Sequence, residues 1–171
     1  MDFTSAFNDL INATHSGFAF LIANGIGWLA VGMTSLRLSV EKTAKVLLYI
    51  GILTMPLAFV LRSILGFADY SPENPLNELG LLLAFSPVVG LAIVIISYIK
   101  LPLYMPSLVS ALLGAHLLPY SWLYQTNIYL IVGILVAIVP SILMLIFREK
   151  GFSIGPFFVG TVLIFGALAL Y

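Results

Sequence analysis

The sequence predicts an all-α integral membrane protein, and three observations lead to this class. Hydrophobic residues make up 61% of the 171 residues, charged residues only 8%, and the mean hydropathy is +1.14, whereas about a quarter of the residues in a soluble domain are charged. The apolar residues form runs of the length that crosses a bilayer, about 20 residues of helix. Most charged residues lie between these runs. We therefore expect residues 1–171 to form one transmembrane helical bundle, embedded in the lipid bilayer of the cell membrane.

Six apolar runs divide the chain. Charged or turn-forming segments separate most of them, such as RLSVEKTAK after the first run and REKG before the last. The third and fourth runs are separated only by SYIKLPLY, where Pro102 disfavours helix at the residue before it. A kink at this point instead of a turn would reduce the count to five. The expected helices cover residues 16–36, 44–66, 79–99, 101–118, 126–147 and 152–170.

The charges support six spans and indicate an orientation. With six spans, one side collects six basic residues together with Glu41 and Glu149, a net charge of +4, and the other collects five acidic residues and Arg62, a net charge of −4. Because Lys and Arg accumulate in cytoplasmic loops, we expect both termini to lie outside. The basic residues are Arg37, Lys42, Lys45, Lys100, Arg148 and Lys150, and the acidic residues are Asp2, Asp9, Asp69, Glu73 and Glu78.

Aromatic residues are expected to mark the outer surface. Pro119 is expected to end the fourth helix, since proline disrupts the hydrogen bonding of a helix interior. Tyrosine and tryptophan favour the membrane–water interface. We therefore predict an outer aromatic belt of Tyr120, Trp122, Tyr124, Tyr129 and Tyr171.

Matching stretches suggest that the six helices form two halves. GILTMP in the second run resembles GILVAIVP in the fifth, and FSPVVG in the third resembles FSIGPFFVG in the sixth. Three helices in each half would place the halves antiparallel, as in the inverted repeats of many transporters. The alternative is coincidence, because Gly, Ile, Leu and Pro are common in membrane spans and the first and fourth runs do not match.

Arg62, His116, Glu78 and His15 are the candidate ligand-binding residues predicted to share the outer layer of the membrane. Arg62 lies about one turn inside the outer end of the second run, where a charge is costly. A guanidinium binds a carboxylate or phosphate group with two parallel hydrogen bonds. The structural alternatives are an arginine whose head reaches the interface or an ion pair with Asp69, Glu78 or Asp9. His116 either contacts a ligand or hydrogen-bonds carbonyls that Pro119 frees, and His15 either joins the site or caps the first helix.

Polar residues also lie inside the spans. Asn24 is the most deeply placed strong polar residue, and its amide either joins helices or contacts a substrate, while Gly25 and Gly27 allow close helix approach. Ser107, Ser110 and Gly114 share one helical face, which we expect to pack tightly against a neighbour. The hydroxyl of Ser86 and other span serines is expected to bond its own helix.

The residues that are absent limit the chemistry. The chain has no cysteine, which excludes thiolate sites, and no basic patch that would bind nucleic acid. A metal site would need both histidines and a carboxylate, but no HxxxH or HExxH motif occurs, and no cofactor motif is present. Ser121 with His116 as base is conceivable, but their spacing does not favour an enzyme.

Three functions remain after these exclusions. The first is binding or transport of a small solute or lipid, with an anionic group as one option, at an outward-facing polar site; full alternating access would then need a homodimer or a partner membrane protein. The second is a non-catalytic accessory or assembly subunit of a membrane complex. The third is a lipid-active membrane enzyme with His116 as its base. The polar residues of the outer layer favour the first.

Overall fold

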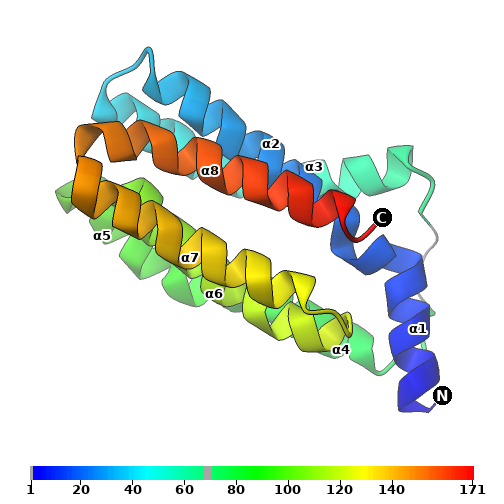
Figure 1. Cartoon of the computed structure of the whole chain (residues 1–171). Helices are drawn as coiled ribbons and strands as arrows, with labels where there is room; N and C mark the ends of the chain where they lie inside the picture. Colours follow the sequence, from blue (N-terminus) through cyan, green and yellow to red (C-terminus); the bar gives the residue numbers. More distant parts are fainter. Residues whose placement is uncertain (1, 68–70) are drawn as a thin grey trace.

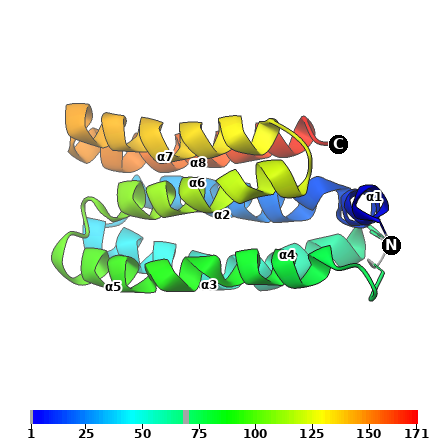
Figure 2. The same ribbon diagram turned by 90° about the horizontal axis from the view of Figure 1, so that it is seen from below.

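Two layers of three membrane-length helices form the body of the protein. The computed structural model describes residues 2–67 and 71–171. One layer contains α3, α2 and α8, and the other contains the stretch α4–η2–α5, then α6 and α7 (Figures 1 and 2). The bounds are α2 Phe18–Ser35, α3 Val40–Ile64, α4 Leu76–Phe85, η2 Ser86–Gly90, α5 Leu91–Lys100, α6 Met105–Leu123, α7 Ile128–Phe147 and α8 Glu149–Leu168.

The six predicted helices are confirmed, including the least secure break. The backbone leaves the helical region at Leu101, directly after α5 ends at Lys100, and α6 begins at Met105. Five stretches are long and apolar enough to cross a membrane among the residues that the structure describes, and α6 is not among them. The helix α6 is less apolar than the others because it carries His116, Ser107 and Ser110, whose side chains are buried inside the bundle.

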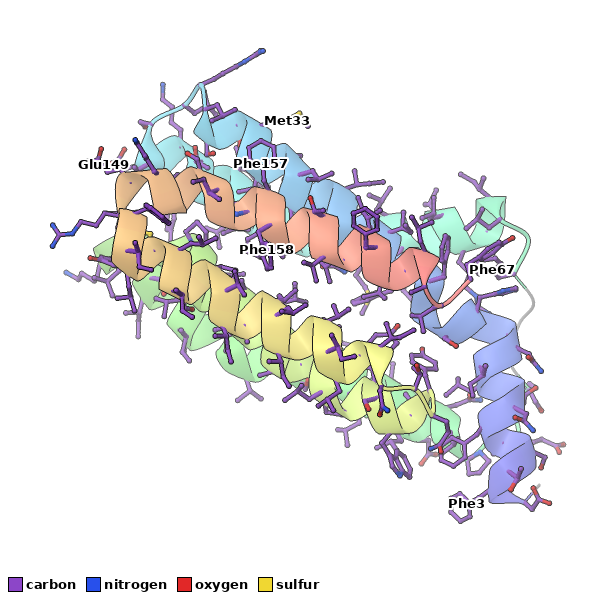
Figure 3. The ribbon with its side chains drawn as sticks, in the orientation of Figure 1. Phe3, Met33, Phe67, Glu149, Phe157 and Phe158 are labelled. Atoms are coloured by element: carbon purple, nitrogen blue, oxygen red, sulfur yellow. The ribbon has the colours of Figure 1, made fainter. Side chains whose placement is uncertain are left out.

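Successive helices run in opposite directions, which places alternate loops at opposite ends of the bundle. The two ends differ in charge because most basic residues lie near the helix boundaries of one end. Both termini lie at one end (Figure 1). In Figure 3, Phe3 and Phe67 lie toward that end and Glu149 lies at the opposite end. The end with Glu149 also carries the helix boundaries near Arg37, Lys42, Lys45, Lys100, Arg148 and Lys150.

Small residues allow the closest helix crossings. A Cβ on Gly25 of α2 would lie 3.1 Å from the carbonyl oxygen of Gly160 in α8, and one on Gly160 would lie 2.8 Å from that of Gly25. Gly114 of α6 and Gly133 of α7 form an equivalent pair. The expected tight packing near Gly25 and along the Ser107–Gly114 face is therefore confirmed. Phe157 of α8 packs over Gly32 of α2 in the same way (Figure 3).

The structure contains one helix that was not predicted, and it corrects the end of another. Residues before the first span form an unpredicted helix, α1 (Phe3–Thr14), which crosses the end of the bundle and joins α2 through a short turn, η1 (His15–Gly17). Asp2 caps α1 by accepting a 2.7 Å hydrogen bond from the Ser5 N–H, which lowers the pKa of the Asp2 carboxyl. The correction is that α6 continues through Pro119 to Leu123. Packing of α6 against α7 and α5 maintains the helix despite the hydrogen bond that proline removes.

Candidate functional site

A cavity of about 200 Å³ lies between the two layers, next to α1. Apolar side chains form most of its wall, and the polar groups come from α1, α3, α4, α6 and α7. Such a mixture of apolar lining and a few polar groups is typical of small-molecule sites. The lining residues are Leu10, Thr14, Gly17, Ala19, Phe20, Met55, Ala58, Phe59, Arg62, Asn77, Gly80, Leu81, Leu117, Tyr120, Leu123, Tyr124 and Tyr129.

Arg62 and Asn77 provide the cationic and amide groups of the cavity wall. Arg62 lies in the last turn of α3 and is half-buried. Asn77 lies in the first turn of α4, and its Nδ2 donates a 2.8 Å hydrogen bond to the carbonyl of Ser71. The Oδ1 atom of Asn77 is buried and has no hydrogen-bond partner among the described residues. The wall therefore includes a guanidinium group and a buried hydrogen-bond acceptor.

Three tyrosines form the inner wall of the cavity. The rings of Tyr120, Tyr124 and Tyr129 lie with centroids 5.3 to 5.8 Å apart. Tyr129 is buried, and its hydroxyl donates a 2.5 Å hydrogen bond to the carbonyl of Ser16. The predicted aromatic belt is therefore wrong for these three residues, which α6 and α7 turn into the bundle. Trp122 and Tyr171 are exposed at this end.

The turn between α1 and α2 depends on this tyrosine cluster. His15, Ser16 and Gly17 all have left-handed backbones, with φ of 46°, 51° and 76°, a conformation that costs energy for residues with a side chain. A Cβ on Gly17 would lie 2.5 Å from the hydroxyl oxygen of Tyr129. Glycine is thus required at position 17 both for its backbone conformation and for space.

Hydrogen bonds fix α1 over the cavity. The Nδ2 of Asn74 donates to the carbonyl of Ala6 and to Oδ2 of Asp9, both at 2.8 Å. The Ser71 N–H donates to the same Asp9 oxygen at 3.2 Å, and Asn74 Oδ1 accepts from the Leu76 N–H at 2.9 Å. Leu10 and Thr14 of α1 therefore remain part of the cavity wall.

His116 lies behind the cavity wall and does not line it. Its ring packs edge-on against Tyr120, with centroids 5.2 Å apart. Its Nδ1 lies 2.9 Å from Oγ of Ser86, and its buried Nε2 has no hydrogen-bond partner among the described residues. One of the two interpretations of His116 was a bond to carbonyls freed by Pro119. Among the described residues, its ring instead contacts Ser86 of η2.

The other three candidates lie outside the cavity. Glu78 is exposed in the first turn of α4. His15 stacks on Phe67 with ring centroids 4.1 Å apart, and it also faces Tyr171. Asn24 donates a 3.0 Å hydrogen bond to the carbonyl of Phe20 in its own helix, so it does not join two helices. Only Arg62 of the five predicted residues lines the cavity.

Some site residues were missed although the sequence carried signals for them. Asn74 directly precedes Pro75 at the start of α4, and Asn77 follows in the first turn of α4. An Asn-Pro pair is a common start for a turn or helix. Asp2 followed by buried Ala6, Leu10 and Ala13 is the cap and spacing of an amphipathic helix. No group of three or more His, Cys, Asp or Glu that could hold a metal occurs among the described residues.

The apolar membrane-length helices around a partly polar cavity define a polytopic helical membrane protein. The chain belongs to a family of unknown function, DUF7010, whose model matches residues 3–171. No curated protein and no solved structure matches it.

Proposed function

We propose that this protein binds a small amphiphile with an anionic head group and moves it across or within the membrane. The observation that carries this proposal is the position of Arg62 in the wall of a mostly apolar cavity. The ligand class is a carboxylate or phosphate attached to a short apolar chain. The head group would lie against Arg62 and the chain among Leu81, Leu117 and Leu123.

The chemistry of the wall supports an anion. A guanidinium holds a carboxylate or phosphate with two parallel hydrogen bonds, and such charge-assisted bonds are about twice as strong as neutral ones. A cavity with low polarity strengthens the attraction further. None of the described residues that line the cavity is acidic.

Asn77 and the tyrosines would refine the specificity. Oδ1 of Asn77 accepts hydrogen bonds only, so it would favour a ligand hydroxyl beside the anionic group. The tyrosine rings offer flat apolar surface to the chain of the ligand. A cavity of about 200 Å³ suits a chain of about eight carbons and excludes a whole diacyl lipid.

Binding of octyl phosphate by the purified protein in maltoside micelles tests the proposal. We expect saturable binding by isothermal titration calorimetry and a weakening of about tenfold to a hundredfold in Arg62→Gln, which corresponds to one charged hydrogen-bonding partner. Arg62→Lys should retain part of the affinity. Octyl trimethylammonium should not bind.

Arg37→Gln is the matched control, because Arg37 is exposed at the opposite end of the bundle. It should leave octyl phosphate binding unchanged. Equal affinities for Arg62→Gln and Arg37→Gln, at unchanged thermal stability, would remove Arg62 from the site. Equal binding of the cationic amphiphile would remove the charge selectivity.

The orientation proposed for this activity places α1 and both termini outside. The support is the charge difference between the ends, because the basic residues gather at the opposite end. The chain has no cysteine, so single cysteines at positions 171 and 37 can be labelled in intact cells. An impermeant maleimide should label position 171 only.

The inverted relation between residues 18–100 and 105–168 remains part of the transport hypothesis. The pairs α2–α3 and α6–α7 support it, since each is an extensively packed antiparallel hairpin. The third helices differ, because α7 packs along α8 whereas α3 hardly touches α4–η2–α5. Uptake of octyl phosphate into proteoliposomes, abolished in Arg62→Gln, would separate transport from binding alone.

An assembly role is the second candidate, and the exposed flank of α4–η2–α5 favours it. Of the described side chains in this stretch, only Leu76, Gly90 and Ser97 are buried. A homodimer or another membrane protein could cover this flank, as could lipid. Native mass spectrometry in mild detergent distinguishes them, and a monomer with bound lipid would exclude a stable complex.

A further inference from the structure

Ser86 differs from most hydroxyl residues in the membrane-length helices, and Ser107, which donates to the carbonyl of Pro140 in α7, is another exception. Most of these side chains donate a hydrogen bond to a carbonyl of their own helix, as is usual for Ser and Thr in spans. Ser86 instead reaches another helix and contacts the imidazole of His116 at 2.9 Å. The residues that bond their own helix are Thr34, Ser35, Thr54, Ser97, Ser110 and Ser141.

The local backbone explains why Ser86 turns outward from its helix. Residues 86–90 form a 3₁₀ stretch between α4 and α5, and Pro87 has no N–H to continue the α-helical pattern. A 3₁₀ segment inside a helix changes the direction in which side chains project and often marks a functional position. Here it aligns Ser86 with α6 at the level of His116.

The pair has the arrangement of a nucleophile and its base. His116 is buried, only 8% exposed, so its ring is fixed by packing, whereas Ser86 is exposed at the surface of the bundle. With the proton on Nε2, the Nδ1 atom accepts the hydroxyl proton of Ser86. A serine hydroxyl within hydrogen-bond reach of an imidazole is the basis of nucleophilic serine catalysis.

The surroundings indicate where a substrate would come from. Phe85, Val88 and Val89 flank Ser86 along the chain and are exposed. In a membrane such side chains contact acyl chains of lipids, so Ser86 meets molecules dissolved in the bilayer. An ester-linked acyl group is the lipid function that a serine nucleophile attacks.

We propose that Ser86 and His116 form a catalytic dyad that cleaves acyl esters of membrane amphiphiles. The Ser86 oxygen attacks the ester carbonyl carbon while its proton passes to Nδ1 of His116. The ester C–O bond then breaks, the leaving alcohol takes the proton from Nδ1, and an acyl-serine forms. Water then attacks the carbonyl carbon of the acyl-serine while a water proton passes to Nδ1 of His116. The bond between this carbon and the Ser86 oxygen breaks, the oxygen takes the proton from Nδ1, and the carboxylic acid is released. This activity goes beyond amphiphile binding and does not depend on Arg62.

A fluorophosphonate probe tests the dyad directly, because an activated serine displaces fluoride and keeps the phosphonyl group. Purified protein in maltoside micelles should gain one adduct in intact-mass spectra, located at Ser86 by peptide mapping. Ser86→Ala should remove the adduct and the hydrolysis of p-nitrophenyl octanoate. His116→Asn should slow labelling at least about a hundredfold, the usual contribution of a general base.

Ser97→Ala is the matched control, since Ser97 lies in α5 of the same stretch and bonds its own helix. Ser121→Ala tests the other serine near His116. Both variants should label at the wild-type rate. Thermal unfolding and elution volume monitor folding, and His116→Gln replaces His116→Asn should that variant misfold.

The absence of an adduct in wild-type protein, under conditions that label an established membrane serine hydrolase, would overturn the proposal. An adduct that persists in Ser86→Ala would do the same. So would wild-type labelling rates in a folded His116 variant, which would reduce the Ser86–His116 contact to a structural link between η2 and α6.

Discussion

Glycines lie in tight contact with a neighbouring helix at the closely packed crossings of the bundle, whereas glycines at its open edge have free space around them. Where α6 crosses α7, a Cβ on Gly133 would lie 2.8 Å from the carbonyl oxygen of Gly114. At the edge formed by α3 and α4, a Cβ on Gly51 or Gly80 would meet nothing within 4 Å. Membrane helices associate largely through such close backbone contact. The bundle is therefore held together along α2–α8, α6–α7 and α7–α8, and it leaves room for a cavity beside α3 and α4.

Buried polar atoms without partners occur in several helices. Among the described residues they include Oγ1 of Thr43 in α3, Oδ1 of Asn77 in α4 and Nε2 of His116 in α6, and of these three residues only Asn77 lines the cavity. Buried polar atoms without partners cost about 1–3 kcal/mol each. A ligand bound in the cavity could offset that cost for Asn77.

The largest expected effect comes from filling a glycine crossing. Gly133→Leu places a side chain against the backbone of α6, and we expect the free energy of unfolding to fall by about 3 kcal/mol, the upper range for overpacking. Titration with dodecyl sulfate in mixed micelles measures it. Gly51→Leu is the control and should cost little, and equal losses for the two variants would remove the contrast between the two sides.

Release of α1 should have the next largest effect, and it should be local. Asn74→Ala removes the hydrogen bonds to Ala6, Asp9 and Leu76, which should destabilise the docking of α1 by about 2 kcal/mol. Hydrogen exchange should increase in residues 3–14 and stay unchanged in α6 and α7. Asn8→Ala, an exposed site on α1, is the control. Uniformly faster exchange would mean that α1 is not an independent cover.

Loss of one buried hydroxyl should have a smaller effect. Tyr129→Phe leaves the carbonyl of Ser16 without its bond, and we expect a loss of about 1–1.5 kcal/mol in the free energy of unfolding. Tyr171→Phe, at an exposed site, should be neutral in the same titration. A neutral Tyr129→Phe would show that the left-handed turn at His15–Gly17 does not need this bond.

The smallest change is expected at the open edge. Gly51→Ala should raise the free energy of unfolding by about 0.5–1 kcal/mol, because alanine restricts the unfolded chain and favours helix. Gly80→Leu should not reduce stability either, yet it should weaken octyl phosphate binding because Gly80 lines the cavity. Destabilisation by Gly80→Leu would indicate that this edge is closed.

The helices could be predicted because their signal is local. Apolar length, Pro102 and the charged loops marked all six membrane-length helices, and the break after Lys100 is real. The same local logic missed α1, because its twelve residues are too short to be recognised as a membrane span. It also ended α6 too early, since the neighbours that maintain a helix through Pro119 cannot be seen in the sequence.

The site could be predicted only in part, because a shared depth in the membrane is not a contact. Arg62 lines the cavity as its isolated charge suggested, but His15, Glu78 and Asn24 face elsewhere. Rotation about a helix axis by a few residues decides which side chain faces a neighbour, and packing of helices sets that rotation.

The sequence alone determined the class of the protein, the positions of its membrane helices and the charge difference between its ends, since these depend on composition and order along the chain. The tertiary structure decided that Tyr120, Tyr124 and Tyr129 form an inner wall and not an outer belt. It also decided that His116 meets Ser86, thirty residues away in sequence. Both outcomes depend on which helices lie side by side, and that choice is made by close contacts such as Gly114 with Gly133.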